Sequence, residues 1–311
     1  MERLAIPFVC PRCRTVLAPN ESKLECSGCG ATYPVVDNVP VLVDSPTEQQ
    51  ESQRRYFDAE FSEYGTYRLE NWRVSFVDRI FSALGIEDGR GPYLDVGVGG
   101  SGATVIEAAR QGVRAVGCDL SEPGVLAARG FAREQGVDGV TQWTVCAAER
   151  LPFPDATFGS ASAVAVLEHL DDDEVAAAEL ARVLQPGGLL WLTVPHAFRY
   201  MLPPVWPLYW WHDRRIGHKR HYDEERLVRL CAHAGLEHVR TSYSAHAVKL
   251  AQFVGTRLFR GMRERRSRAW WRLEHLDRRA EKRRYGAMQL SAVFRRPPEE
   301  HGYRARSDAG T

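Results

Sequence analysis

The sequence predicts an α/β protein in which a small cysteine-rich module precedes a parallel β-sheet covered by helices on both faces. Three observations support this prediction. Four of the seven cysteines lie within the first 29 residues. From Pro92 onward, apolar runs rich in β-branched residues alternate with segments of helical periodicity. A glycine cluster follows the first of these runs directly, as it does at many ligand sites of parallel sheets.

The composition fits a soluble globular chain. Of the 311 residues, 44% are hydrophobic and 26% are charged, which is ordinary for such proteins. No run approaches the roughly 20 apolar residues that a membrane span needs. The first residues contain no apolar core long enough for a secretory signal. We therefore expect a cytoplasmic protein.

The first predicted unit covers residues 1–44. Its cysteines form two C-x2-C pairs about a dozen residues apart, namely Cys10, Cys13, Cys26 and Cys29. This spacing lets four thiolates close tetrahedrally on one zinc ion. Thiols stay reduced in the cytosol, which argues against a disulfide framework. Because four cysteines leave no open coordination position, we expect the zinc to be structural.

The segment after the cysteines, "ATYPVVDNVPVLV", alternates turn residues with β-branched ones and predicts a hairpin. Together with the cysteines, residues 5–43 resemble the zinc ribbon of the tRNA-methyltransferase activator subunits. A ribbon this small has too little core to fold alone, so loss of zinc should unfold it. Residues 45–91 then read as a polar linker and one or two helices, which we expect to pack over the mouth of the next domain.

The stretch "YLDVGVGGSGATV" at residues 93–105 predicts a strand, a glycine loop and the start of a helix. Gly97, Gly99 and Gly102 satisfy G-x-G-x-x-G, and the next strand, "RAVGCDL", ends in Asp119. Ligands of parallel sheets bind at these carboxyl ends, where a carboxylate can accept both hydroxyls of a ribose. NAD and S-adenosylmethionine (SAM) both contain such a ribose, so these residues alone leave both cofactors open.

Further features favour SAM. Asp95 is placed to reach the loop and the positive amino group of a methionine moiety, whereas the pyrophosphate of NAD would be repelled there. "AAERLPFPDATFG" follows the third predicted strand, and "AVAVLEHLDD" ends the fourth. "ARVLQPGGLLWLTVP" then predicts a helix, a Pro-Gly-Gly turn and a fifth strand. Several motifs in this order along the chain are stronger evidence for SAM binding than the glycine motif alone.

Over residues 70–245 this order resembles the class I SAM-dependent methyltransferases, in particular the type 11-like branch with its L-P-F-x-D-x-x-F segment. The resemblance implies a Rossmann-like, seven-stranded methyltransferase sheet, a SAM-binding domain at 92–245 and an acceptor-site insertion at 196–222. It also implies the residues that bind the cofactor: Asp95, Gly97, Gly99, Ser101, Asp119, Leu120, Ala148, Glu149, Val166 and Leu167.

The chain departs from the family pattern at three of its positions. Ser101 stands where the family often has its third glycine, and Ala147 replaces an acid that commonly meets the adenine amino group. Gly159 replaces the usual aspartate after Phe158. Each change could weaken SAM binding, but none removes the ribose anchor, Asp119. A relative that no longer binds SAM remains an alternative.

Methyl transfer from a sulfonium mainly requires alignment of the acceptor, and a base helps only if the acceptor must lose a proton. The catalytic candidates are His169 in "LEHL" and His218 and Tyr222 in "GHKRHY", with His221 beside them. The alternatives are a packed residue at the end of the fourth strand for His169, and a basic surface loop for the "GHKRHY" group.

The aromatic segment "FRYMLPPVWPLYWWHDRR" contains three prolines, and we expect it to be too irregular for a helix. It could be a lid, a pocket for a hydrophobic acceptor, or a surface that touches a bilayer with its arginines at headgroup level. Between Ser244 and Met288 the chain carries 13 Arg or Lys against 4 Asp or Glu, a net of +9. This basic excess indicates either solvated helices or an anionic partner such as a phosphate-bearing substrate, RNA or a lipid surface.

Residues 246–296 are therefore expected to form a basic helical insertion and the last strand, and residues 297–311 a disordered tail. The leading function is methyl transfer to oxygen or nitrogen of a small molecule, a glycan or a lipid-linked intermediate, in the cytoplasm or peripherally at the inner membrane face. One alternative is an rRNA or tRNA methyltransferase, in which the ribbon and basic segment hold the RNA backbone. Another is a non-catalytic protein that docks a partner through its ribbon.

Overall fold

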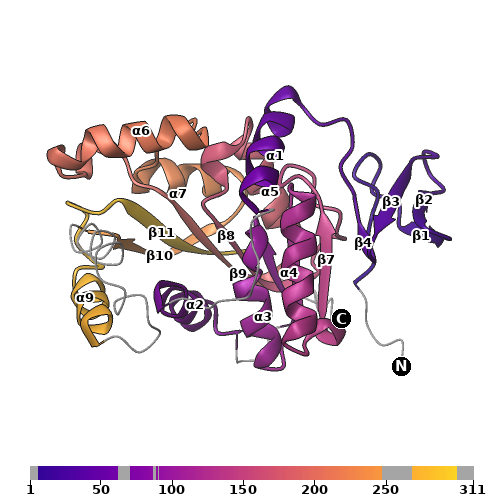
Figure 1. The fold of residues 1–311 in the computed structure, drawn as a ribbon, viewed down its shortest axis with the longest axis horizontal. Coiled ribbons are helices and arrows are strands. Elements are labelled where there is room, and N and C mark those ends of the chain that lie inside the picture. The colour runs from indigo at the N-terminus through magenta and orange to yellow at the C-terminus, as the bar shows by residue number, and fades with distance from the viewer. Residues whose placement is uncertain (1–5, 62–70, 87–88, 90, 247–267, 300–311) are drawn as a thin grey trace, which may run out of the picture.

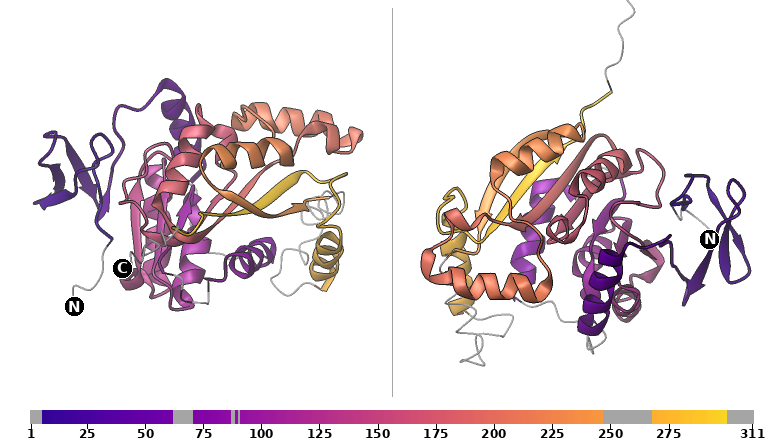
Figure 2. Two further views of the ribbon diagram at one scale, coloured as in Figure 1. Left: turned by 180° about the vertical axis from the view of Figure 1, so that it is seen from behind. Right: turned by 90° about the horizontal axis from the view of Figure 1, so that it is seen from above.

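A computed structural model describes residues 6–61, 71–86, 89, 91–246 and 268–299 of the chain. A small four-stranded sheet near the N-terminus lies at one end of the molecule, beside a seven-stranded sheet with helices on both faces (Figure 1). Both views in Figure 2 place the small sheet outside the body of the larger one. The α/β fold with a small N-terminal module is therefore confirmed.

The small sheet is antiparallel throughout. Its strands, in spatial order, are β1 (Leu17–Asn20), β2 (Lys23–Cys26), β3 (Thr32–Val36) and β4 (Val39–Pro40). The expected hairpin is the β3–β4 pair, in which Val36 faces Val39. A cluster of five buried residues forms its interior: Cys10, Leu17, Cys26, Tyr33 and Leu42. So small a core cannot provide much stability by itself.

The small sheet is attached to β7 (Thr141–Val145), the edge strand of the large sheet. Val41 bridges Val145 in parallel, and the Leu42 amide donates to the Val145 carbonyl at 2.7 Å. The Thr144 hydroxyl donates to the Pro40 carbonyl at 3.0 Å. An uncovered edge strand can pair with other chains, so this attachment also protects the edge of the large sheet (Figure 1).

The large sheet has the spatial order β10-β11-β9-β8-β5-β6-β7. Its other strands are β5 (Tyr93–Val96), β6 (Ala115–Asp119), β8 (Phe158–Val164), β9 (Leu184–Pro195), β10 (Glu237–Ser244) and β11 (Gln289–Arg295). From β9 to β7 the strands are parallel, as expected. The sheet is nevertheless mixed, because β11 inserts antiparallel to both β9 and β10.

The helices divide between the two faces of this sheet and its upper rim. Helices α2 (Asn71–Leu84), α3 (Ala103–Arg110) and α4 (Glu122–Glu134) share one apolar core with one face. Helices α5 (Asp173–Val183) and α7 (Glu224–His233) share a second core with the other face. Helix α1 (Glu48–Phe61) lies over the carboxyl ends of the strands, so one of the two expected N-terminal helices covers the mouth.

The expectation of an irregular aromatic segment is wrong, because Trp206–Ile216 forms helix α6. Two prolines precede this helix, and Pro207 is its second residue, where the missing amide hydrogen has no helical partner to lose. Nothing after Pro207 interrupts the helix.

Of the basic segment, the structure describes helix α9 (Arg268–Arg279), whereas residues 247–267 lie outside the described residues. The last expected strand is present as β11. Residues 297–299 have no regular structure, and the rest of the expected disordered tail, 300–311, lies outside the described residues. Among the residues that are described, no helix has the length and apolar character needed to cross a bilayer.

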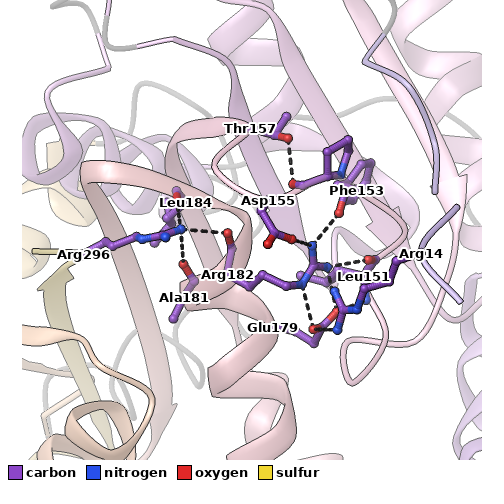
Figure 3. A network of polar contacts seen from close by, with 11 residues as sticks. Arg14, Leu151, Phe153, Asp155, Thr157, Glu179, Ala181, Arg182, Leu184 and Arg296 are labelled. Atoms are coloured by element: carbon purple, nitrogen blue, oxygen red, sulfur yellow. Dashed lines mark hydrogen bonds and ion pairs between the residues drawn. The ribbon is translucent and has the colours of Figure 1, made fainter. Parts of the chain in front are cut away.

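A largely buried arginine, Arg182, whose side chain is 15% exposed, organises the "LPFPD" loop that follows β7. Arg182 on α5 donates to two carbonyls and two carboxylates (Figure 3), those of Leu151, Phe153, Asp155 and Glu179. Glu179 also accepts from the Leu151 amide at 3.0 Å and from Arg14 of the small module at 2.7 Å. The network therefore joins the loop, the helix and the N-terminal module.

We expect Arg182→Ala to lower the free energy of unfolding by about 3 kcal/mol, because it leaves the buried Glu179 carboxylate short of its main cation. Asp155→Ala is the matched control: its side chain is 71% exposed, and its loss should cost less than about 1 kcal/mol. Urea unfolding of both variants measures the difference. Equal losses would contradict the assigned role of the buried pair.

Candidate functional site

A cavity of about 570 Å³ opens at the carboxyl ends of the parallel strands. Pockets of about 300–1,000 Å³ are typical of small-molecule sites. Residues that follow β5, β6, β7 and β8 line one side, and β9 contributes its last residues. Helices α1 and α6 close the cavity from above with Phe57, Phe61, Tyr209 and Ile216.

The glycine loop after β5 requires glycine for steric reasons. Gly97 and Gly99 have φ values of +75° and +59°, in the left-handed region. A Cβ atom at Gly97 would lie 2.3 Å from the side chain of Val166, which follows β8. The loop is held by the Gly97 amide, which donates to the Cys118 carbonyl at 2.8 Å. The turn after β8 therefore packs directly against the glycine loop.

Asp119 lies at the end of β6 and faces the same cavity. Its carboxylate accepts from the Gly99 amide and from the Ser121 amide, each at 2.9 Å. Burial raises the pKa of Asp119, although these hydrogen bonds act in the opposite direction. The interaction with Gly99 ties the glycine loop to the end of β6.

Seven of the ten predicted cofactor residues line the cavity: Gly97, Gly99, Asp119, Leu120, Ala148, Glu149 and Val166. Asp95, Ser101 and Leu167 are not among the lining residues. Asp95 lies below the loop, where it accepts from the hydroxyls of Thr104 and Ser162, and burial raises its pKa to about 6. Leu167 is part of the apolar core, and Ser101 ends the short helical turn after Gly99.

Two of the three predicted catalytic residues, His169 and His218, also line the cavity. Their rings contact each other edge-on with centroids 4.8 Å apart. Burial, with a smaller contribution from His218, lowers the pKa of His169 to about 3. Tyr222 is fully buried away from the cavity lining, and its hydroxyl donates to Asp173 at 2.7 Å and to the Leu167 carbonyl at 3.2 Å. Tyr222 therefore supports the turn that carries Glu168 and His169.

Sequence reasoning missed Glu168 and Asp213. Glu168 lines the cavity at 1% exposure, and burial, with a contribution from Asp213, raises its pKa to about 8. Asp213 contacts His218 Nδ1 through Oδ1 at 2.8 Å and His221 Nε2 through Oδ2 at 2.7 Å. Burial tends to raise the pKa of Asp213, but hydrogen bonds from His218 and His221 outweigh it and lower the pKa.

Asp213 could have been found from helical spacing. Tyr209, Asp213 and Ile216 lie at positions i, i+4 and i+7 of α6, a pattern that places three side chains on one helix face. The prolines at the start of the segment obscure this helical pattern. Glu168 had no comparable signal, since a single acid beside a histidine is common on surfaces.

The four predicted metal ligands come together in the small module. Their sulfur atoms all lie within 4.8 Å of one another, with Cys10 and Cys29 3.6 Å apart and Cys13 and Cys26 3.3 Å apart. Sulfur atoms bound tetrahedrally at about 2.3 Å from zinc lie about 3.8 Å apart. The cluster therefore fits one tetrahedrally bound metal ion without rearrangement of the backbone.

Residues 94–192 match the family model described as a methyltransferase domain. Norajmaline N-methyltransferase of Rauvolfia serpentina is 30% identical over 161 residues, which is 52% of this chain and 54% of that protein. Other matched relatives have names that specify carbon or oxygen acceptors. The chain spans about half the length of the curated relatives it matches.

Two solved structures share the fold over most of the chain. Geranyl diphosphate C-methyltransferase from Streptomyces coelicolor, in complex with Mg²⁺, geranyl diphosphate and S-adenosyl-L-homocysteine, has a TM-score of 0.58 at 17% identity, covering 81% of this chain and all of that one. The [4+2]-cyclase SpnF has a TM-score of 0.57 at 22% identity, covering 82% and 99%. At these identities the likeness concerns the fold alone.

The strand order, the glycine loop and the acid at the end of β6 define a class I, Rossmann-like nucleotide-binding fold. Residues 94–192 of this chain match the methyltransferase domain model, and the likeness to the matched N-methyltransferase extends over about half of the chain. Which acceptor it uses does not follow from the fold, because proteins with this fold act on different atoms.

Proposed function

We propose that this chain is a SAM-dependent methyltransferase that acts on an oxygen or nitrogen atom of a small, partly apolar acceptor. The observation that carries the proposal is that one cavity is lined by two chemically different groups of residues. We call the part near the glycine loop and Asp119 the cofactor half, and the part near Glu168, His169 and His218 the acceptor half. Such an arrangement suits a reaction in which a nucleoside cofactor and an acceptor must be aligned in the same enclosed space.

In this proposal the cofactor half binds SAM, which supplies a methyl group on a positively charged sulfur. Gly97 and Gly99 contact the methionine part of SAM, and the Asp119 carboxylate accepts hydrogen bonds from the ribose hydroxyls. Leu120, Ala148 and Glu149 meet the adenine, and Val166 lies under the sulfonium. Asp95, Ser101 and Leu167 do not line the cavity. In this proposal they affect SAM binding indirectly, by supporting the glycine loop and the turn after β8.

Asp119→Ala should weaken SAM binding by about 10- to 150-fold, since hydrogen bonds to a charged group contribute roughly 1.5–3 kcal/mol. Isothermal titration calorimetry measures the loss. Asp119→Asn keeps the size of the side chain and an acceptor for the Gly99 amide. This variant therefore distinguishes the effect of the negative charge on SAM binding from the effect of the hydrogen bond that supports the loop. Native SAM affinity in a folded Asp119→Ala protein would contradict the assignment.

The acceptor half supports a small substrate better than a long RNA segment. Phe57 of α1 meets the His169 ring edge-on, with centroids 5.3 Å apart, and Tyr209 and Ile216 of α6 line the same cavity. We propose that the insertion at 196–222 forms this acceptor side, that His169 and His218 contact the acceptor, and that Tyr222 positions them. A metabolite, a glycan or the reactive end of a lipid-linked intermediate fits such a space.

The outer face of α6 supports the lipid-linked version. Trp206, Trp210 and Trp211 are 41%, 53% and 57% exposed. The guanidinium of Arg214 lies 4.6 Å from the Trp210 ring centroid, and that of Arg215 lies 5.8 Å from the Trp211 ring centroid. Tryptophan and arginine together suit the boundary between lipid headgroups and acyl chains. We propose that this face meets an anionic membrane surface. Tyr209 and Ile216 of the same helix line the acceptor cavity.

The double variant Arg214→Gln/Arg215→Gln should bind vesicles containing phosphatidylglycerol about 30-fold less tightly, because each arginine near an anionic surface contributes roughly 1 kcal/mol. Trp210→Ala/Trp211→Ala should weaken binding to the same vesicles, and Val16→Ala, an exposed apolar residue of the small module, should have no effect. Co-sedimentation measures all three. Binding by the wild type that does not depend on lipid charge would exclude the membrane version.

We also propose that Cys10, Cys13, Cys26 and Cys29 bind one structural zinc ion. The support is the fit of the four sulfur atoms and the small core around them. Zinc would stabilise the module, and the module in turn covers the edge of β7.

Replacing Cys10 and Cys26 by serine should remove one equivalent of zinc per chain and unfold residues 6–43, because the small core of the module cannot offset the loss of the metal. Elemental analysis and hydrogen exchange of the β1–β4 amides measure the two effects. Cys231→Ala is the control: it removes a buried thiol from α7 without touching the cluster. Unchanged zinc content in the double variant would refute this site.

A further inference from the structure

The acceptor half of the cavity brings together one carboxylate and two imidazoles. Glu168 and His169 lie in the turn after β8, and His218 lies in the loop after α6. One ligand atom from each of the three lies within 4.8 Å of the others. The Lys219 amide donates to the Glu168 carbonyl at 2.8 Å, which fixes the loop beside the turn. The group is therefore built by backbone contacts between two separate elements.

Two atoms of this group are buried without a partner among the residues that the structure describes. They are Glu168 Oε2 and His169 Nδ1. The Glu168 side chain is 1% exposed, and a buried carboxylate oxygen that lacks a hydrogen bond is costly. The second Glu168 oxygen lies 3.8 Å from His218 Nε2, too far for a hydrogen bond. Two ligand atoms that each lie about 2.1 Å from one metal ion are about 3–4 Å apart. The 3.8 Å between the Glu168 oxygen and His218 Nε2 therefore fits two ligands of the same ion.

His218 has the outer partner that a metal-binding histidine usually has. Its Nδ1 lies 2.8 Å from Asp213 Oδ1, which leaves Nε2 as the nitrogen on the side of Glu168. Imidazoles that bind metals commonly donate their other ring hydrogen to a carboxylate, which fixes the tautomer and the ring orientation. Asp213 is held in turn by His221 Nε2 at 2.7 Å. Because Asp213 and His221 already bond each other and their neighbours, they suit this supporting position better than that of ligands.

We propose that Glu168, His169 and His218 bind one divalent transition-metal ion, and that the acceptor binds the same ion. One carboxylate with two imidazoles suits Zn²⁺, Mn²⁺, Fe²⁺ or Co²⁺ better than Mg²⁺ or Ca²⁺, which prefer oxygen ligands alone.

This inference rests on the proposed methyl transfer. An acceptor hydroxyl bound to the ion would lose its proton to water more readily. The oxygen then forms a bond to the methyl carbon as the carbon–sulfur bond breaks, which gives the methyl ether, S-adenosylhomocysteine and one proton.

The test uses the full chain, loaded with Co²⁺ and then desalted, and counts metals by elemental analysis. The wild type should hold two equivalents of metal, one in the cysteine module and one in the cavity. Cobalt bound to four thiolates absorbs strongly in the visible range, so this absorption reports the ion in the cysteine module. Glu168→Gln should hold one equivalent and keep the thiolate absorption. Glu149→Gln is the matched control, because Glu149 lines the same cavity, also has a buried unpartnered oxygen, and lies outside the cluster.

Asp213→Asn should weaken Co²⁺ binding by about 10- to 100-fold, as expected for an outer partner of a ligand. His169→Gln provides a second test of the ligand set if Glu168→Gln does not fold. One equivalent in the wild type, or two in folded Glu168→Gln, would overturn the metal site. Calorimetry with SAM on the same samples distinguishes the two proposals. SAM binding by a protein with a single equivalent of metal would exclude only the metal site. Absence of SAM binding would exclude the proposed function.

Discussion

The hydrogen bond from the Gly99 amide to the Asp119 carboxylate is the interaction on which the rest of the site depends. It joins the loop after β5 to the end of β6, the two places where a parallel sheet exposes its backbone to a ligand. Gly97 leaves no room for a side chain beside Val166, so the turn after β8 packs directly on this loop. The position of Glu168 and His169, two and three residues after Val166, therefore follows from the geometry of the cofactor loop.

Much of this architecture could be predicted from the sequence because it is local. Strand β6 ends at Asp119, the hairpin β3–β4 forms, and the cysteines of the two C-x2-C pairs meet, because spacing within about thirty residues determines each of these features. Seven of the ten residues predicted to bind the cofactor line the cavity, and each of these predictions also rests on a local motif. Asp95 was assigned a direct contact because its place beside the loop is visible in the sequence, whereas its burial under Thr104 and Ser162 is not.

The features that could not be predicted arise from contacts between distant segments. Pairing of Val41 with Val145 covers the sheet edge, and β11 inserts between β9 and β10, but neither pairing leaves a local pattern. Helix α6 was missed because its prolines suggested a break, although they lie before the helix and in its first turn. Because the helix was not predicted, Asp213 was not identified either. Asp213 contacts His218 and explains its position. The acceptor half is thus the part of the site that only tertiary structure reveals.

We propose that one cavity holds a SAM-type nucleoside against the Glu168, His169 and His218 group. The decisive measurement is a crystal structure of the full chain with S-adenosylhomocysteine. The ribose hydroxyls should bind Asp119, and the sulfur should face His169 and His218. Nucleoside density elsewhere, or a sulfur directed away from His169 and His218 in a fully occupied site, would contradict it.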